Sequence, residues 1–180
     1  MTSTTGAFTI RPERHADAVA IRRVVAGAFG STAEADLVDA IRASPGYVPE
    51  LALVAEADGE VVGHVMISGA RLDGDDAVSW PIVMLSPLAV APSHQGRGVG
   101  GALVRAVVGL ADERGEPLVV LEGSPTYYAR FGFEDARRHG IQLPLPDWAP
   151  AEAGQVRRLG RYDATWRGTV VYPPAFDGVD

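Results

Sequence analysis

The sequence predicts an α/β domain in which helices pack against one sheet, and three observations lead to this prediction. A strand-like run at 82–90, a glycine-rich turn, a helical pattern and a second apolar strand at 118–122 follow one another in mid-chain. Two amphipathic helical segments precede them. The chain has 180 residues, 47% of them apolar, without repeats or a low-complexity linker, so we expect a single domain over 1–180.

The N-terminal half predicts a strand, two helices and a β-hairpin. A capping-box spacing at Ser31 and Glu34 marks the start of the second helix. The dipeptide Asp58-Gly59 is typical of tight hairpin turns, so the runs beside it should pair antiparallel. The expected elements are a strand at 8–10, helices over 13–29 and from 31 to just before Pro45-Gly46, and strands at 51–57 and 60–70.

The next strand, at 82–90, follows a polar loop at 71–79 and contains Pro87. Proline lacks the N–H that a central strand needs for its ladder. We therefore expect a β-bulge or a splayed strand pair there, with an edge strand as the alternative. A local gap would leave backbone groups for a ligand.

A glycine-rich turn from Gln95 to Gly101 joins this strand to a helix that begins near Val99. Because few Cβ atoms crowd such a turn, several N–H groups can converge, and the helix start adds unpaired N–H groups and a positive dipole end. The expected guest is a phosphate or pyrophosphate. A nucleoside-triphosphate loop is excluded because the chain has no lysine.

The same turn also matches a dinucleotide fingerprint, Gly96-x-Gly98-x-x-Gly101. Glu122 then lies about twenty residues on, where a ribose-binding acid is expected. However, such a fingerprint follows its strand directly, whereas residues 91–95 intervene here. The alternative spacing, Gln95-x-x-Gly98-x-Gly100, is more consistent with a turn that is separated from its strand in this way.

The chain beyond the turn predicts a helix, a buried strand and a capped turn. Val99, Leu103, Val107 and Leu110 mark one helical face, and Gly115 ends the helix. The remaining elements are a strand at 118–122, a short helix carrying Tyr127 and Tyr128 with Ser124 as N-cap and Pro125 as first residue, a strand starting at 131–134, and one or two strands after 139, including 168–172.

Composition excludes several classes of function. All 16 basic residues are arginine and 23 residues are acidic, so the net charge of -7 disfavours nucleic acid and mildly favours a cationic amine partner. Without cysteine there is no disulfide or cysteinyl acyl-enzyme, and no His/Asp/Glu spacing indicates a metal site. Met1–Gly6 lacks leader features and no apolar run could cross a bilayer, so we expect a cytoplasmic protein without a membrane partner.

Two motifs resemble those of the GNAT N-acetyltransferase family. Leu88-Ala89-Val90 followed by Gln95-Gly96-Arg97-Gly98-Val99-Gly100 is similar to its acetyl-CoA motif, and Tyr128-Ala129-Arg130-Phe131-Gly132-Phe133 to its Tyr-x-x-x-Gly-Phe motif. With the segment 168–176, the chain resembles a subgroup of small predicted bacterial N-acetyltransferases. The resemblance implies a mixed, mostly antiparallel sheet with splayed central strands and helices on both faces.

The resemblance also implies acetyl-CoA as co-substrate; no metal is expected, because no suitable ligand spacing occurs. The strand residues Leu88, Ala89 and Val90 would pair with the pantetheine arm, and the glycine-rich loop would hold the pyrophosphate through its N–H groups. The set is Leu88, Ala89, Val90, Gln95, Gly96, Arg97, Gly98, Val99, Gly100, Gly101 and Ser124.

For the chemistry, the opened strand near Leu88 offers an N–H to the developing oxyanion, and Tyr128 matches the family position that donates a proton to the CoA sulfur. Tyr127 is expected in the core or the cleft wall. Glu122 is the first candidate for the general base, and water with the backbone is an alternative. His64 could reach the cleft, but a hydrogen-bonded core histidine is the favoured interpretation.

These observations predict an acetyl-CoA-dependent N-acetyltransferase that acts directly on a primary amine of a small molecule or peptide. The family analogy adds a possible homodimer. Two alternatives stay open: a CoA-binding sensor without turnover, and a dinucleotide-binding oxidoreductase.

Overall fold

The computed structural model describes residues 7–178, so the Met1–Gly6 stretch considered above lies outside the described residues. Nine strands form one sheet in the order β1-β2-β3-β4-β5-β8-β6, with β9 pairing with β3 and β7. The strands are β1 (Thr9–Pro12), β2 (Ala52–Ala57), β3 (Glu60–Asp73), β4 (Ser79–Val90), β5 (Leu118–Glu122), β6 (Glu134–Asp135), β7 (Ile141–Gln142), β8 (Gly154–Arg158) and β9 (Gly168–Val171). No helix in 7–178 is long and apolar enough to span a membrane.

The sheet is mixed and mostly antiparallel. Among the described strand pairs only β4–β5 and β7–β9 run parallel. This confirms the expected fold class and differs from the parallel, doubly wound sheet of a dinucleotide-binding domain. At the β2–β3 turn Asp58 (φ 51°) and Gly59 (φ 78°) adopt the left-handed conformation that a tight hairpin requires, which confirms the predicted hairpin.

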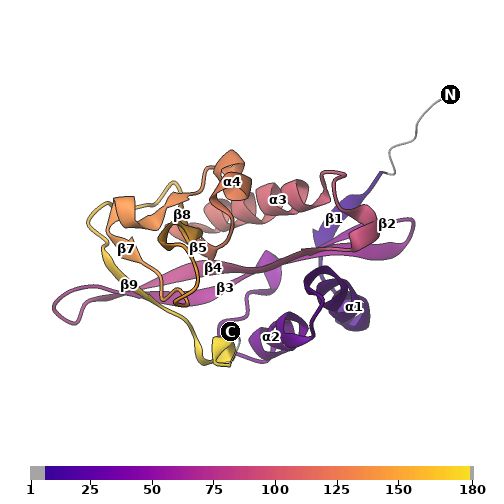
Figure 1. Ribbon diagram of the computed structural model, residues 1–180, viewed down its shortest axis with the longest axis horizontal. Helices are drawn as coiled ribbons and strands as arrows, with labels where there is room; N and C mark the ends of the chain where they lie inside the picture. Colours follow the sequence, from indigo (N-terminus) through magenta and orange to yellow (C-terminus); the bar gives the residue numbers. More distant parts are fainter. Residues whose placement is uncertain (1–6, 179–180) are drawn as a thin grey trace.

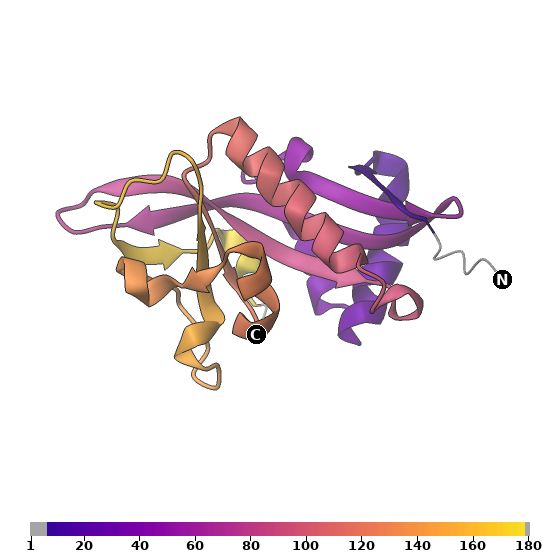
Figure 2. The same ribbon diagram turned by 90° about the horizontal axis from the view of Figure 1, so that it is seen from above.

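Helices cover both faces of the sheet (Figures 1 and 2). The long helix α3 (Val99–Arg114) crosses one face, with the short α4 (Pro125–Tyr128) on the same side. The other face carries α1 (Ala18–Phe29) and α2 (Ala33–Arg42). The two faces of the sheet are therefore covered by different helices and can present different groups to a substrate.

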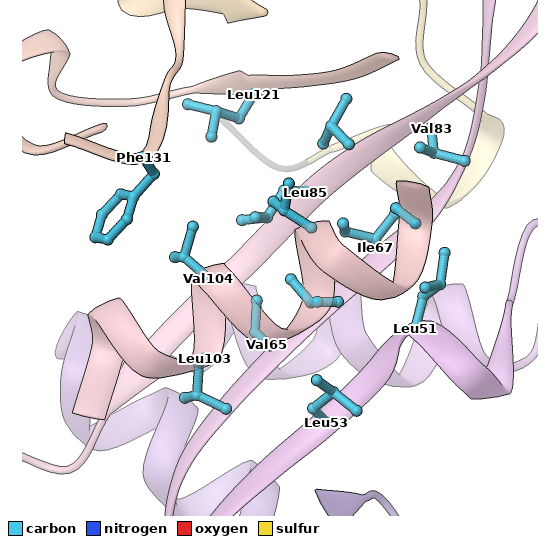
Figure 3. Close-up of a cluster of buried hydrophobic side chains, with 14 of the residues drawn as sticks. Leu51, Leu53, Val65, Ile67, Val83, Leu85, Leu103, Val104, Leu121 and Phe131 are labelled. Atoms are coloured by element: carbon cyan, nitrogen blue, oxygen red, sulfur yellow. The ribbon is translucent and has the colours of Figure 1, made fainter. Parts of the chain in front are cut away.

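A cluster of buried hydrophobic side chains lies under α3 (Figure 3). Leu103 and Val104 of the helix contact a layer of sheet residues that includes Leu53, Val65 and Leu85. Burial of each such side chain contributes about 1.5–3 kcal/mol, which fixes α3 and the glycine turn at its start against the sheet.

A second cluster lies under α1 and α2. It is formed by Ile21, Val24, Val25, Ala35, Leu37, Val38, Ile41, Ala52, Val54, Met66 and Ala89. A third cluster, on the same side of the sheet but toward β9, is formed by Leu72, Ile82, Met84, Leu118, Val120, Ala136, Ile141, Val156 and Val170.

Two predictions about the N-terminal helices are wrong in detail. The first helix begins at Ala18 and not near Glu13, because the chain at Glu13 is tied to the sheet by an N–H donated to the Ala52 carbonyl at 2.9 Å. The capping box does not form as predicted. The Ser31 hydroxyl accepts from the Ala33 N–H at 3.0 Å, two residues on, and α2 begins after Thr32.

Three further differences follow from packing. Leu110 is 36% exposed, because the buried face of α3 is rotated onto Val104 and Val108. The strands β3 and β4 extend into the expected loop at 71–79, where β9 adds a third partner. Phe131 lies in a 3₁₀ turn, and the following strand, β6, is two residues long.

Candidate active site

The two central strands β4 and β5 separate soon after they meet. Within the described residues their register is limited to Val83↔Val119 and Met84↔Val120. Beyond this point β4 continues along β3, and β5 pairs with β8. The edge of β4 from Leu85 to Val90 therefore borders a gap in the sheet.

Pro87 lies in a β-bulge at this gap, as its position predicts. Val65 pairs with Leu88 and Ile67 with Leu85, so two residues of β4 face one residue of β3. The peptide bond between Ser86 and Pro87 is cis. The sequence predicted either a β-bulge or a splayed strand pair, and the structure contains both: the bulge between β3 and β4, and the separation of β4 from β5.

The bulge and the end of β4 decide which backbone groups face the gap. The Ala91 N–H donates to the Val62 carbonyl of β3 at 2.8 Å. Because polar groups alternate along a strand, Ala89 also turns toward β3, whereas Leu88 and Val90 direct their N–H and C=O groups into the gap. Ala89 also buries its side chain in the cluster under α1 and α2. Leu88 and Val90 are thus the two residues of the predicted trio that can bind an extended ligand here.

The glycine-rich turn has the geometry of an anion cradle. Gly96 (φ 73°) and Gly98 (φ 82°) adopt the left-handed conformation that other residues avoid. The first helical hydrogen bond of α3 runs from the Ala102 N–H to the Gly98 carbonyl at 3.1 Å, so the N–H groups of 98–101 precede the helical ladder. The Gln95 side chain donates to the Val90 carbonyl at 3.0 Å, which ties the turn to the end of β4.

A cavity of about 400 Å³ opens at this cradle. Seven of the predicted cofactor-binding residues line it: Val90, Gln95, Gly96, Gly98, Val99, Gly100 and Gly101. His94, Arg105, Tyr127, Arg130 and Phe131 complete the lining. Leu88, Ala89, Arg97 and Ser124 lie outside it; Ser124 caps α4 by accepting from the Tyr127 N–H at 3.3 Å.

The far wall of the cavity is aromatic and cationic. A Cβ atom on Gly100 would lie 2.7 Å from the Tyr127 hydroxyl, so a glycine is needed where the helix start meets this ring. The Arg130 guanidinium lies 4.6 Å from the Tyr127 ring centre, and that of Arg105 lies 5.0 Å from the Phe131 ring centre. Among the described residues neither arginine has a carboxylate within ion-pair distance, so both can receive a phosphate.

Tyr128 is held on the same side of the sheet by other aromatic rings. Its ring meets Tyr127 edge-on at 4.9 Å and Phe133 at 5.7 Å. A Cβ atom on Gly123 would lie 2.6 Å from this ring, so the glycine lets Tyr128 pack against the end of β5. Burial raises the pKa of Tyr128 to about 12, and its hydroxyl stays protonated at neutral pH.

Glu122, the last residue of β5, lies at the separated ends of the central strands. Its carboxylate accepts a hydrogen bond from the Tyr172 hydroxyl, which comes from the chain after β9. Burial and this carboxylate raise the pKa of Tyr172, so the hydroxyl remains a donor.

His64 is a core histidine and does not reach the cleft. It is fully buried, and its Nε2 lies 2.9 Å from a carboxylate oxygen of Glu13. Burial lowers the pKa of His64 and keeps the ring neutral. The same carboxylate accepts from Arg42 at 2.9 Å and from Tyr47 at 2.8 Å.

Four residues of this region are not indicated by any of the sequence patterns above: Arg105, Arg130, Tyr172 and Glu13. Nothing in the sequence distinguishes Arg105 and Arg130 from the other arginines. The helical offset of four residues from Gly101 could, however, have placed Arg105 beside the cradle. Tyr172 and Glu13 lie far from their partners in the chain, so no local pattern could have indicated them.

Comparison with known proteins places the chain among acetyltransferases. A sequence model of the acetyltransferase (GNAT) domain matches residues 9–136. The chain is 38% identical over 141 residues to the uncharacterized N-acetyltransferase YjhQ of Escherichia coli (77% of each chain), and 38% identical over 151 residues to YhbS of the same species (83% of this chain, 86% of YhbS).

Two crystal structures resemble the fold over nearly its full length. One is the GNAT family N-acetyltransferase YhbS from Escherichia coli in complex with CoA, with a TM-score of 0.85, 34% identity and coverage of 98% of this chain and 96% of that chain. The other is a GNAT family acetyltransferase from Brucella melitensis in complex with acetyl-CoA, with a TM-score of 0.77, 32% identity and coverage of 96% and 99%.

Proposed function

The chain belongs to the GNAT acetyltransferase family, and we propose that it transfers the acetyl group of acetyl-CoA directly to a primary amine. One observation carries this proposal: the open edge of β4 ends at Val90, which lines the same cavity as the glycine cradle. A strand edge suits an amide-bearing arm and a helix start suits a diphosphate. The two relatives solved with CoA and acetyl-CoA support this choice of ligand.

The chain's own groups match the parts of that co-substrate. The Leu88 carbonyl and the Val90 N–H can pair with the pantetheine amides, since both groups face the gap. The N–H groups of 98–101 can bind the pyrophosphate, and Arg105 and Arg130 can neutralise further phosphate charge at the cavity wall.

The thioester carbonyl needs a donor where charge develops. The Leu88 N–H, turned into the gap beside the bulge, can donate to this oxygen, and such a preorganised backbone donor accounts for about 10²–10³ in rate in other acyl transfers. Attack by the amine nitrogen forms the new C–N bond, and the C–S bond breaks as the thiolate leaves.

Two side chains can move the protons. Tyr128, protonated at neutral pH, can donate to the departing sulfur, and Glu122 can accept the proton that the amine loses. Both lie at the separated ends of β4 and β5.

A screen for released CoA thiol with phenethylamine, cadaverine and an alanyl peptide tests the activity. With an accepted amine, Tyr128→Phe should lower kcat by about 10²-fold and leave the KM for acetyl-CoA unchanged, because a proton donor contributes to the transition state alone. Tyr162→Phe, a matched loss of a phenol beside His139, should have no effect.

One outcome would overturn the proposal, and another would overturn the role of Tyr128. Thermal protection by CoA without thiol release from any amine would indicate a binding module without turnover. An unchanged kcat in Tyr128→Phe would remove that residue from the reaction.

A further inference from the structure

The segment that follows β9 connects the two ends of the sheet face opposite α3. After pairing with β3 and β7, the chain leaves the sheet at Tyr172, forms the 3₁₀ turn η7 (Pro174–Phe176) and reaches α2 (Figures 1 and 2). Phe176 packs against both the cluster under α1 and α2 and the cluster toward β9. No residue of this segment lines the cavity described above.

Tyr172 is fixed in place by its neighbours. Its ring centre lies 5.6 Å from that of Phe176, and it packs against the cluster toward β9. Its hydroxyl donates to Oε1 of Glu122. One carboxylate oxygen is thereby engaged, and Oε2 remains for another partner.

The two faces of β5 place this pair opposite the cavity. Leu121 packs under α3, whereas Val120 belongs to the cluster beside Tyr172. Because side chains alternate across a strand, Glu122 shares the face of Val120. β4 last pairs with β5 at Val120, so Glu122 lies at the mouth of the gap on the face away from α3.

We propose that Tyr172 is a positioning residue that holds the Glu122 carboxylate at this mouth, and that the segment 172–176 walls the site of a protonated primary amine. The inference rests on the proposed function and deepens it. With acetyl-CoA bound from the α3 side, the amine must approach through the gap from the opposite side. A carboxylate bound by the Tyr172 hydroxyl, with the Phe176 ring packed against Tyr172, suits an ammonium group.

The proton balance follows from this geometry. Oε2 of Glu122 takes one proton of the ammonium group and releases it to solvent, and the freed lone pair forms the C–N bond. Tyr128 on the other side protonates the sulfur as the C–S bond breaks, and the second proton that the nitrogen loses as the amide forms returns through water to the Tyr128 oxygen. Tyr172 keeps its own proton throughout and sets the direction of the Glu122 carboxylate.

The test compares Tyr172→Phe, Glu122→Gln, the double variant and the control Tyr162→Phe. Each full-length protein is assayed with the accepted amine of the panel and with hydroxylamine, a nucleophile that is neutral at neutral pH and needs no deprotonation before it attacks. With the amine we expect kcat to fall about tenfold in Tyr172→Phe and about 10²-fold in Glu122→Gln, and the double variant to match Glu122→Gln. Turnover of hydroxylamine should fall much less than turnover of the amine, and the KM for acetyl-CoA should stay the same.

The outcomes separate this inference from the proposed function. Equal losses with both nucleophiles, additive losses in the double variant, or full activity in Tyr172→Phe would overturn the role of Tyr172. If Glu122→Gln keeps full activity with the amine, the base assignment fails and the role of Tyr172 fails with it. If the wild-type protein acetylates no amine, the proposed function itself fails.

Discussion

Neutralising the buried carboxylate of Glu13 should destabilise the fold more than any exposed glutamate does. This side chain is 4% exposed and accepts hydrogen bonds from Arg42 and Tyr47 while it faces the His64 ring. It joins the chain before α1, the end of α2 and strand β3. His64 pairs in register with Ala89, so the network also supports β4 beside the gap.

The magnitude follows from the pKa of Glu13. Burial raises that pKa, but the hydrogen bonds from His64 and Arg42 outweigh it and lower the value from 4.5 to about 2. The difference corresponds to about 3 kcal/mol of stability. Because the folded-state pKa is depressed, this stability is complete above pH 4.5 and is lost as the pH falls toward 2. Burial lowers the pKa of His64 below 6.5, so its contribution also declines as the pH falls below that value.

Urea unfolding measured from pH 7 down to about pH 2 checks this expectation. The wild-type free energy of unfolding should decrease steadily below about pH 6.5, and Glu13→Gln should lose about 3 kcal/mol at pH 7. Glu60→Gln, at an exposed position at the start of β3, is the matched control and should change little. A loss below about 0.5 kcal/mol in Glu13→Gln would refute the reasoning.

Three further predictions concern the cavity and helix α3. Gly100→Glu should weaken CoA binding at least tenfold by calorimetry, since the new side chain meets the Tyr127 hydroxyl and brings negative charge to the helix start; unchanged affinity would remove the cradle from the site. Arg130→Ala should weaken CoA binding by about tenfold, and less at high salt, because a cation at the cavity wall is lost; a salt-independent loss would point to packing instead. Gly109→Ala should stabilise the protein by about 1 kcal/mol in thermal unfolding, since the position is helical with nothing within 4 Å; a lower Tm would contradict this.

The parts of the site that sequence could predict are those built from neighbouring residues. The cradle at 95–101 depends on glycines that must adopt left-handed conformations and on a helix start, and both are local properties. The N-cap at Ser124 and the hairpin at Asp58-Gly59 are local in the same sense. The bulge at Pro87 followed from one missing N–H group.

The parts that sequence could not predict depend on distant partners. Which helix face is buried is set by the sheet beneath it, so Leu110 faces solvent although its spacing suits the core. Tyr172 and Glu122 are separated by 50 residues in the chain, so no periodicity in the sequence could indicate that they form a hydrogen bond. Glu13 and His64 likewise meet across the fold.

The sequence alone determined the family resemblance, the alternation of strands and helices, and a turn able to bind a diphosphate, because each depends on the preferences of adjacent residues. Only the tertiary structure decided that β4 and β5 part beside that turn, that Arg105 and Arg130 reach its cavity, and that Glu122 faces away from it toward Tyr172. Those arrangements arise from packing between elements remote in sequence, where burial and not local propensity fixes each side chain.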